Sequence, residues 1–388
     1  MSATPSPRPF TLNIADEHIQ ELKARLARTR LPDQTPGDPW AYGTDVAWLA
    51  GLIEHWRERF DWRAQEAALN AFPQFKVALA GIDLHFIHAQ GEGPSPTPLL
   101  LSHGWPGSVF EFLELIPRLT HPSRFGGDPA DAFTVVAPSL PGFGLSFAPN
   151  QPRFSAEQMA DCFVELMSSV LGYPRFAAQG GDWGSFITSR IGFAYPDKVF
   201  GIHLNFMPLR RDPSIAPSPT PQESRYLDEL ATFMREDTGY QAIQGTRPQT
   251  LAFALTDSPA GLAAWIGEKF QRWTDNDGTP ESAVDRDRML ANIALYWFTG
   301  AIGSSFWPYY ARMHGPWPVP AGHTVDVPTG YCESPREILR PPRSLADRAY
   351  SNIQRWTVFP RGGHFAAMEQ PAALAHEIQQ FFRPLTGR

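Results

Sequence analysis

The strongest chemical signal in the chain is the string Gly180-Gly181-Asp182-Trp183-Gly184-Ser185. It follows a short apolar stretch and precedes an apolar helical one, so it predicts a tight strand-to-helix turn that presents a nucleophile. The glycines permit the sharp turn, and Asp182 would then project above the end of a sheet, at a helix N-terminus. The alternative is that Asp182 only caps the helix. We interpret Asp182 as the nucleophile.

An aspartate nucleophile favours one kind of reaction. A carboxylate can attack an electrophilic sp3 carbon in line, which leaves an ester on the enzyme itself. Water activated by a histidine can then attack the carbonyl carbon of that ester while an oxyanion hole stabilises the tetrahedral species. Epoxides and alkyl halides suit this chemistry, whereas amides and ordinary esters fit it poorly.

Two further loops could complete the site. The apolar stretch Leu99–Leu101 precedes the string HGWPGS at 103–108, where a second oxyanion donor is needed, so the backbone amides of Trp105 and Trp183 are the natural pair. We expect His103 only to hydrogen-bond the backbone. His364 follows the last predicted strand, which is the place of the base in the order nucleophile, acid, base of α/β-hydrolases.

Position alone leaves the acid open. The loop after the predicted strand Thr324–Thr329 offers Glu333 and Glu337, and Asp326 lies inside that strand. An opening epoxide also needs acidic O–H donors, whereas a departing halide needs N–H donors such as indole. Candidate O–H donors are the tyrosines of the region that we interpret as a cap: Tyr226, Tyr240, Tyr296, Tyr309 and Tyr310.

The surrounding pattern predicts an α/β fold with a mostly parallel sheet. Residues 1–95 read as an N-terminal extension of helices and a β-hairpin that wraps the core. From Leu99, apolar strands alternate with amphipathic helices, such as a helix predicted at Val109–Leu119, and this is typical of a parallel sheet with crossover helices. We therefore assign 96–205 and 323–388 to an α/β-hydrolase core, and 206–322 to an inserted helical cap.

The composition excludes several classes of protein. Hydrophobic residues make up 43% of the 388 residues and the net charge is −7, so neither a disordered chain nor a binder of nucleic acid is expected. The two cysteines, Cys162 and Cys332, rule out a disulfide framework. No signal peptide or membrane anchor is readable at the N-terminus, and we expect a soluble cytoplasmic protein.

The chain closely resembles the microsomal-type epoxide hydrolases, which include insect juvenile-hormone and fungal members. The resemblance covers nearly the whole chain. It rests on several separated strings: HGWPGS at 103–108, QGGDWGS at 179–185, LTDSPAGLAAWIGEKF at 255–270, VPTG at 327–330 and RGGHFAAMEQP at 361–371.

The resemblance implies roles for individual residues. Asp182 would be the nucleophile, His364 the general base, and the amides of Trp105 and Trp183 the oxyanion donors. It selects Glu337 over Glu333 as the acid, and Tyr240 and Tyr309 as the proton donors, with Tyr310 as the neighbouring alternative. We also expect the side chains of Trp105, Trp183 and Phe143 to contact the substrate.

We therefore expect an epoxide hydrolase that converts small apolar epoxides and water to vicinal diols, with no cofactor and no metal ion. A haloalkane dehalogenase would share the aspartate turn and is the main alternative. A catalytically inactive binding protein is a second one, against which the placement of nucleophile, acid and base argues. The oligomeric state, including a homodimer, stays open.

Overall fold

A computed structural model describes residues 5–211 and 215–387 of the chain. The sheet that organises it runs in the order β1-β2-β3-β5-β4-β6-β7-β8-β9. The first three strands and β5 pair antiparallel, and all later pairs are parallel. The strands are β1 (Arg8–Phe10), β2 (Gln74–Leu79), β3 (Ile82–Ala89), β4 (Thr97–Ser102), β5 (Phe133–Pro138), β6 (Phe176–Gly180), β7 (Val199–Leu204), β8 (Thr329–Glu333) and β9 (Ile353–Val358).

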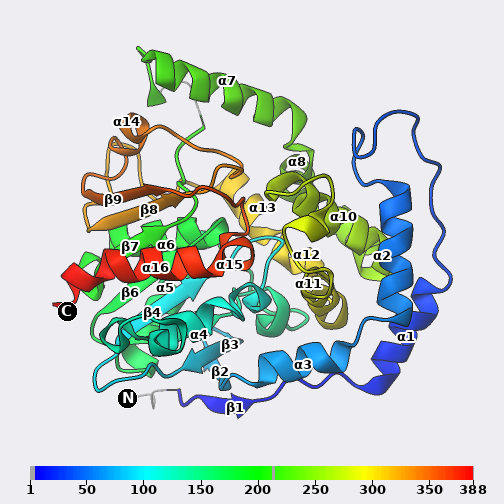
Figure 1. Cartoon of the computed structure of the whole chain (residues 1–388), viewed down its shortest axis with the longest axis horizontal. Coiled ribbons are helices and arrows are strands. Elements are labelled where there is room, and N and C mark those ends of the chain that lie inside the picture. The colour runs from blue at the N-terminus through cyan, green and yellow to red at the C-terminus, as the bar shows by residue number, and fades with distance from the viewer. Residues whose placement is uncertain (1–4, 212–214, 388) are drawn as a thin grey trace.

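The central parallel strands are mostly apolar because helices cover both faces of this part of the sheet. All residues of β5 and β6, for example, are buried. Figure 1 shows the C-terminal helix crossing in front of the sheet with other helices behind it. The helices of this part are α4 (Leu115–Thr120), α5 (Ala156–Glu165), α6 (Trp183–Ala194), α14 (Arg343–Ala346), α15 (Ala366–Glu369) and α16 (Pro371–Phe382). The predicted α/β-hydrolase fold with a mostly parallel sheet is confirmed.

Helices with no strand between them fill the region from residue 221 to 314. They are α7 (Pro221–Glu236), α8 (Gly239–Thr246), α9 (Pro248–Asp257), α10 (Pro259–Trp273), α11 (Arg286–Thr299), α12 (Ile302–Ser305) and α13 (Trp307–His314). In Figure 1 they lie beyond the carboxyl ends of the parallel strands, and α7 extends away from the rest. The predicted cap 206–322 also contains residues 212–214, which lie outside the described residues.

Three N-terminal helices reach the cap from the other side: α1 (Asp16–Leu26), α2 (Val46–Glu58) and α3 (Trp62–Asn70). Figure 1 shows α1 and α2 beside α10. Arg25 Nη1 pairs with Asp257 Oδ1 at 3.0 Å, and Thr44 Oγ1 donates to the carbonyl oxygen of Ala264 at 2.8 Å. These contacts tie the N-terminal region to the cap. The predicted boundaries at 95 and 205 stay a prediction, and β2 and β3 pair into the central sheet.

Two predicted elements differ from the structure. The strand expected at Thr324–Thr329 begins only at Thr329 and continues to Glu333, because Pro328 has no N–H for the ladder. Val325 makes a single bridge to Tyr350 instead. The helix expected from Val109 to Leu119 is split into a 3-10 turn at Val109–Phe112 and the helix α4. None of the helices in the described ranges is long and apolar enough to span a membrane.

Candidate active site

Asp182 stands on the turn between β6 and α6, with a backbone φ of +47° and ψ of −125°. A residue with a side chain rarely adopts this backbone conformation, and strained backbone conformations are common at functional sites. The turn packs so closely that a Cβ on Gly184 would lie 1.9 Å from the carbonyl oxygen of Ser102. A Cβ on Gly104 would lie 2.3 Å from Oδ1 of Asp182. Both positions therefore require glycine, and the two glycine-rich strings of the sequence meet here.

His364 lies between two carboxylates. Its Nδ1 is 2.6 Å from Oε1 of Glu337, and its Nε2 is 3.4 Å from Oδ2 of Asp182. Glu337 follows β8 in the loop, and its Oε1 also accepts the backbone N–H of Ile338 at 2.7 Å. Glu333, the other predicted candidate, is the last residue of β8 and makes no contact with His364 in the described part of the chain. His364 thus connects Glu337 to Asp182 through two successive contacts.

The charge state of His364 follows from this arrangement. Burial disfavours the imidazolium, but the carboxylates of Glu337 and Asp182 outweigh it and raise the pKa of His364 well above its ordinary value. His364 is therefore protonated while Asp182 is ionised. Neutralising Asp182 would remove one of the two anions that stabilise the imidazolium.

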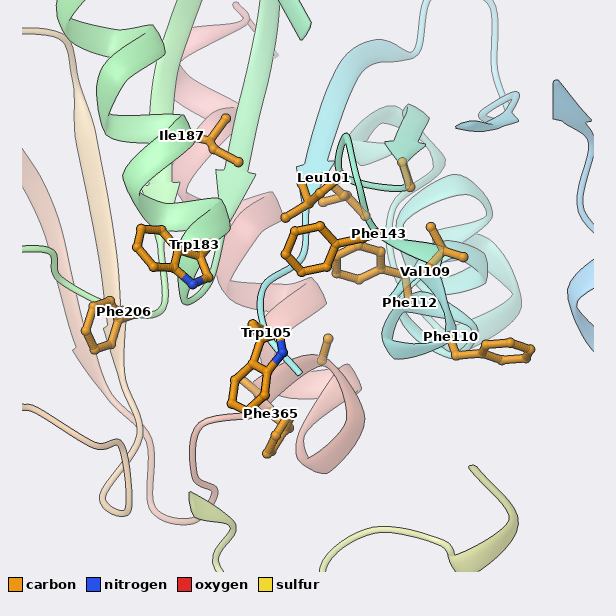
Figure 2. Packing of buried hydrophobic residues seen from close by; sticks show 14 of the residues in the cluster. Leu101, Trp105, Val109, Phe110, Phe112, Phe143, Trp183, Ile187, Phe206 and Phe365 are labelled. Atoms are coloured by element: carbon orange, nitrogen blue, oxygen red, sulfur yellow. The ribbon is translucent and has the colours of Figure 1, made fainter. Parts of the chain in front are cut away.

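One of the predicted oxyanion donors already contacts the carboxylate. The backbone N–H of Trp105 donates to Oδ1 of Asp182 at 2.8 Å. Oδ2 faces His364 instead, so the two oxygens have different surroundings. Trp183 is the first residue of α6. Figure 2 shows the side chains of Trp105 and Trp183 among the buried apolar residues where β4 and β6 end.

Tyr240 and Tyr309 line the same cavity as Asp182, a space of about 300 Å³ between the sheet and the cap. The Tyr240 ring stacks on Trp105 with 5.4 Å between centroids and 11° between planes. Tyr309 meets Tyr240 edge-on at 5.7 Å. Tyr310 stacks on Trp307 and His314 instead, so the structure brings Tyr309 rather than Tyr310 to the cavity.

Both phenols are protonated at neutral pH. Burial raises the pKa of Tyr240 and of Tyr309, and the charge of Asp182 acts in the same direction. Gln241 Nε2 donates to the Tyr240 oxygen at 2.8 Å. Lys269 Nζ lies 4.4 Å from the centroid of the Tyr240 ring. The last two contacts stabilise negative charge on the Tyr240 oxygen when its proton leaves.

A second, smaller cavity of about 20 Å³ lies on the core side of Asp182. Asp182, His364 and Glu111 line it together with Gln179 and Asn205, whose side chains are hydrogen-bonded at 2.7 Å. This volume is sufficient for one water molecule with polar partners. Burial raises the pKa of Glu111 to about 8, so this carboxyl is mostly neutral at pH 7. Glu111 was not predicted from the sequence, although a charged residue within the apolar run VFEFL at 109–113 was a signal for it.

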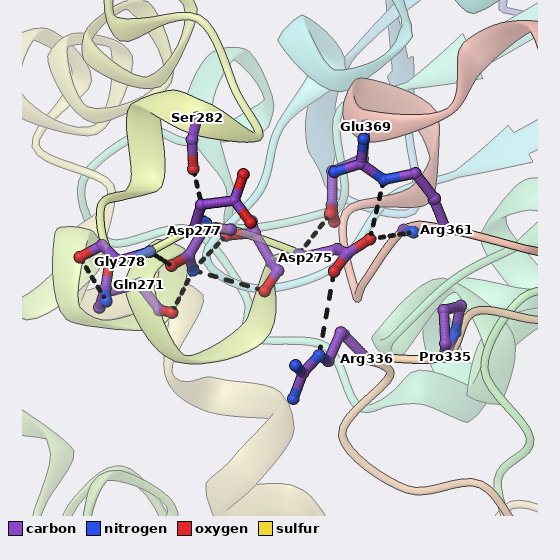
Figure 3. Close-up of polar contacts among 12 residues, drawn as sticks. Gln271, Asp275, Asp277, Gly278, Ser282, Pro335, Arg336, Arg361 and Glu369 are labelled. Atoms are coloured by element: carbon purple, nitrogen blue, oxygen red, sulfur yellow. Dashed lines mark hydrogen bonds and ion pairs between the residues drawn. The ribbon is translucent and has the colours of Figure 1, made fainter.

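The loop that carries His364 is fixed by polar contacts, and Figure 3 shows those around Asp275, Arg361 and Glu369. The Asp275 carboxylate accepts the backbone N–H of Gly362 at 3.0 Å, and Glu369 accepts the backbone N–H of Asp275 at 2.8 Å. The backbone N–H of His364 donates to the carbonyl oxygen of Trp273 at 2.7 Å. The end of α10 thus holds His364 in place, which links the cap to the core at the site.

Three other residues considered in the sequence make contacts that serve the structure. His103 is buried and bonded to the backbone on both sides: its Nδ1 lies 3.0 Å from the Gly104 oxygen, and its Nε2 accepts the Leu140 N–H at 3.2 Å. Phe143 packs edge-on against His103 and lies outside the described residues that line the larger cavity. Asp326 is exposed and accepts a hydrogen bond from Thr324 at 2.6 Å. Within the described ranges, no group of three or more His, Cys, Asp or Glu side chains could hold a metal ion.

Comparisons with known proteins show the family of the chain. Residues 7–112 match the family described as "Epoxide hydrolase N terminus", and residues 97–227 match "alpha/beta hydrolase fold". A protein of Stigmatella aurantiaca is 45% identical over 380 residues, which are 98% of this chain and 86% of that protein. Epoxide hydrolase 1 of Oryctolagus cuniculus is 36% identical over 402 residues, covering 96% of this chain and 88% of that protein. The chain belongs to the epoxide hydrolase family.

Two solved structures of epoxide hydrolases show the same fold. The juvenile hormone epoxide hydrolase of the silkworm Bombyx mori superposes with a TM-score of 0.87 at 31% identity, covering 99% of this chain and 95% of that one. The Aspergillus niger epoxide hydrolase superposes with a TM-score of 0.85 at 30% identity, covering 99% and 98%. The family membership expected from the sequence is confirmed.

Proposed function

We propose that this protein hydrolyses epoxides to vicinal diols through a covalent ester on Asp182. The observation that carries the proposal is the position of the Asp182 carboxylate, which shares one cavity with the buried phenols of Tyr240 and Tyr309. Its Oδ2 lies 3.4 Å from Nε2 of His364. A nucleophile and two acids around one space, with a base beside the nucleophile, are the parts that this two-step reaction needs.

In the first step, Oδ2 of Asp182 attacks an epoxide carbon. Oδ1 stays with the Trp105 amide, so Oδ2 is the oxygen that forms the bond. As the C–O bond of the ring breaks, Tyr240 or Tyr309 donates its proton to the departing oxygen. The product is an alkyl ester of Asp182 with a neighbouring hydroxyl group.

In the second step, a water molecule attacks the carbonyl carbon of that ester. Esterification removes the charge of Asp182, which lowers the pKa of His364. The proton that His364 then releases restores the phenol that donated in the first step, and the neutral His364 can act as a general base. Glu337 stabilises the imidazolium that forms again when His364 takes the proton from water. The amides of Trp105 and Trp183 stabilise the oxyanion, and collapse releases the diol and the Asp182 carboxylate.

The walls of the larger cavity suit an apolar carbon skeleton next to the epoxide. Phe186, Phe206 and Trp317 line it beside the two tyrosines. We propose a small apolar epoxide and water as the reactants. The expected cytoplasmic location and the homodimer stay predictions.

Haloalkane dehalogenation is the second candidate function, because one observation favours it. The indole N–H groups of Trp105 and Trp183 are buried, and that of Trp105 has no hydrogen-bond partner among the described residues. Such groups can bind a departing halide. Release of bromide from a bromoalkane, unaffected by replacing both tyrosines with phenylalanine, would favour this reaction over epoxide opening.

The His364→Gln variant tests the proposed mechanism. It keeps the nucleophile and the phenols but removes the base, so the ester should form and persist. Intact mass after incubation with styrene oxide should show an adduct of one substrate mass, which is absent when Asp182→Asn is added as a control. Turnover of the His364→Gln variant at the wild-type rate would contradict the assignment of the base.

A further inference from the structure

The larger cavity contains two positive charges that the proposed reaction of an apolar epoxide does not use. Arg211 and Arg312 line it together with Asp182 and Tyr240. The side chains of Met234 and Met313, also in the lining, are 44% and 52% exposed, so this cavity opens to the surface. A cationic lining is notable in a chain with a net charge of −7.

The two arginines are held by aromatic rings and neutral groups rather than by acids. Arg211 Nη1 donates to Oε1 of Gln241 at 2.9 Å. The guanidinium carbon of Arg312 lies 4.3 Å from the ring centroid of Trp317, and that of Arg210 lies 5.6 Å from the same ring. Within residues 5–211 and 215–387, no carboxylate lies within 4.0 Å of these three guanidinium groups.

Some other partly buried arginines of the chain pair with acids. Arg355 contacts Glu377 at 2.6 Å, and Arg383 pairs with Asp131. Around Arg312, by contrast, burial and the charges of Arg210 and Arg211 lower the pKa of the guanidinium. Three half-buried cations near one another repel, so an anion placed between them would be bound favourably.

This positive cluster is connected to the proton donor. Arg211 donates to Gln241, and Gln241 donates to the oxygen of Tyr240 at 2.8 Å. One molecule in the cavity could therefore place an anionic group at Arg211 and Arg312 and an epoxide at Asp182. A planar carboxylate matches the paired N–H groups of a guanidinium, and the aromatic walls suit a hydrocarbon chain between the two ends.

We propose that the substrate class includes epoxides that carry a carboxylate, with Arg211 and Arg312 as the carboxylate-binding residues. This inference rests on the proposed function, because it concerns the same cavity. The carboxylate binds at the open end of the cavity and the hydrocarbon chain lies against Trp317 and Phe186. The epoxide then meets Asp182 and the two phenols.

The test compares 10,11-epoxyundecanoate with its methyl ester, which differ in charge and little in shape. The wild type should have a kcat/KM about tenfold higher for the acid, mainly through KM, as expected for one charge-assisted contact. The preference should fall as NaCl is raised, because salt screens the interaction. In Arg312→Met, and separately in Arg211→Met, the ratio of acid to ester kcat/KM should fall about tenfold.

Arg153→Met is the matched control. Arg153 is also partly buried, lies over the ring of Phe147 at 5.6 Å and is outside the lining of the cavity. Its replacement should leave the ratio unchanged. Equal kcat/KM values for acid and ester in the wild type, or a ratio unaffected in both cavity variants, would overturn the proposal.

A binding measurement separates this proposal from the proposed function. Titration calorimetry with undecanoate requires no turnover. If the wild type hydrolyses neither substrate, the proposed function fails, and calorimetry still decides the carboxylate site. Undecanoate binding that is lost in Arg312→Met supports the site, and binding that is equal in the wild type and this variant overturns it.

Discussion

The core side and the cap side of the larger cavity are built in different ways. On the core side, Asp182, His364 and Glu337 stand on loops at the carboxyl ends of parallel strands, and hydrogen bonds between charged groups join them. On the cap side, Tyr240 and Tyr309 stand on helices and are held mainly by aromatic packing. The charged groups are thus fixed to the sheet, whereas the position of the two phenols depends on how the cap packs. Variants on the two sides should stop different steps.

The largest effect is expected on the cap side. Replacing both Tyr240 and Tyr309 with phenylalanine removes the proton donors but keeps the rings, so formation of the ester should slow by about 10⁴-fold or more. Single-turnover quenching followed by intact mass measures this step. Tyr310→Phe is the control and should form the ester at the wild-type rate, since Tyr310 stacks outside the cavity. Ester formation at an unchanged rate in the double variant would contradict the role of the two tyrosines as proton donors.

On the core side, Glu337→Gln should affect the other step. The imidazolium of His364 loses its charged partner, so hydrolysis of the ester should slow by about 10³-fold while ester formation changes only a few-fold. The ester should then accumulate during turnover of styrene oxide, as seen by intact mass. Glu333→Gln is the control, because Glu333 makes no contact with His364 in the described part of the chain. An equal slowing of both steps would contradict the division of roles.

The pH dependence should separate the two steps further. The raised pKa of His364 belongs to the state in which Asp182 is ionised, and esterification lowers it. Hydrolysis needs neutral His364, so its rate should fall about tenfold per pH unit below the pKa of the ester form. Ester formation needs protonated phenols, and the raised pKa values of Tyr240 and Tyr309 keep it active at higher pH. Rapid-quench measurements at several pH values should show that, as the solution is acidified, the rate of ester hydrolysis begins to fall at a higher pH than the rate of ester formation. Rates that begin to fall at the same pH would contradict this.

The smallest effect is expected at Glu111, and it concerns stability. Its pKa in the folded protein is raised to about 8, above the ordinary value of 4.5. The neutral carboxyl is therefore the stable form, and the free energy of unfolding should decrease as the pH rises from about 5 through 8, by at most about 1.4 kcal/mol per unit of pKa shift. Urea unfolding at pH 5 and pH 8 should show a weaker decrease in Glu111→Gln than in the wild type. Equal decreases in both proteins would show that Glu111 does not carry this dependence.

The core side was predictable from the sequence because its residues belong to short glycine-rich strings. The tight turn around Asp182 and the loop around His364 need glycine for close approach, and that requirement is visible in the chain itself. The choice between Glu333 and Glu337 was not visible from position. It depends on where β8 begins, and the strand predicted at Thr324–Thr329 was placed too early.

The cap side was much less predictable. Tyr309 and Tyr310 are neighbours on α13, and which one faces the cavity depends on how that helix packs against α8. Glu111 was missed because the split of the predicted helix Val109–Leu119 turns this carboxyl inward. Arg211 and Arg312 come from distant segments, and only the folded cap brings them into one cavity.

The central claim is that a water molecule attacks the carboxyl carbon of Asp182 and not the epoxide. Single-turnover hydrolysis of styrene oxide by excess enzyme in ¹⁸O-water tests this claim most directly. The account predicts that the label enters the Asp182 carboxylate, found by mass spectrometry of the peptide that contains it, and that the first diol released is unlabelled. Label in the first diol, with an unlabelled Asp182 peptide, would contradict it.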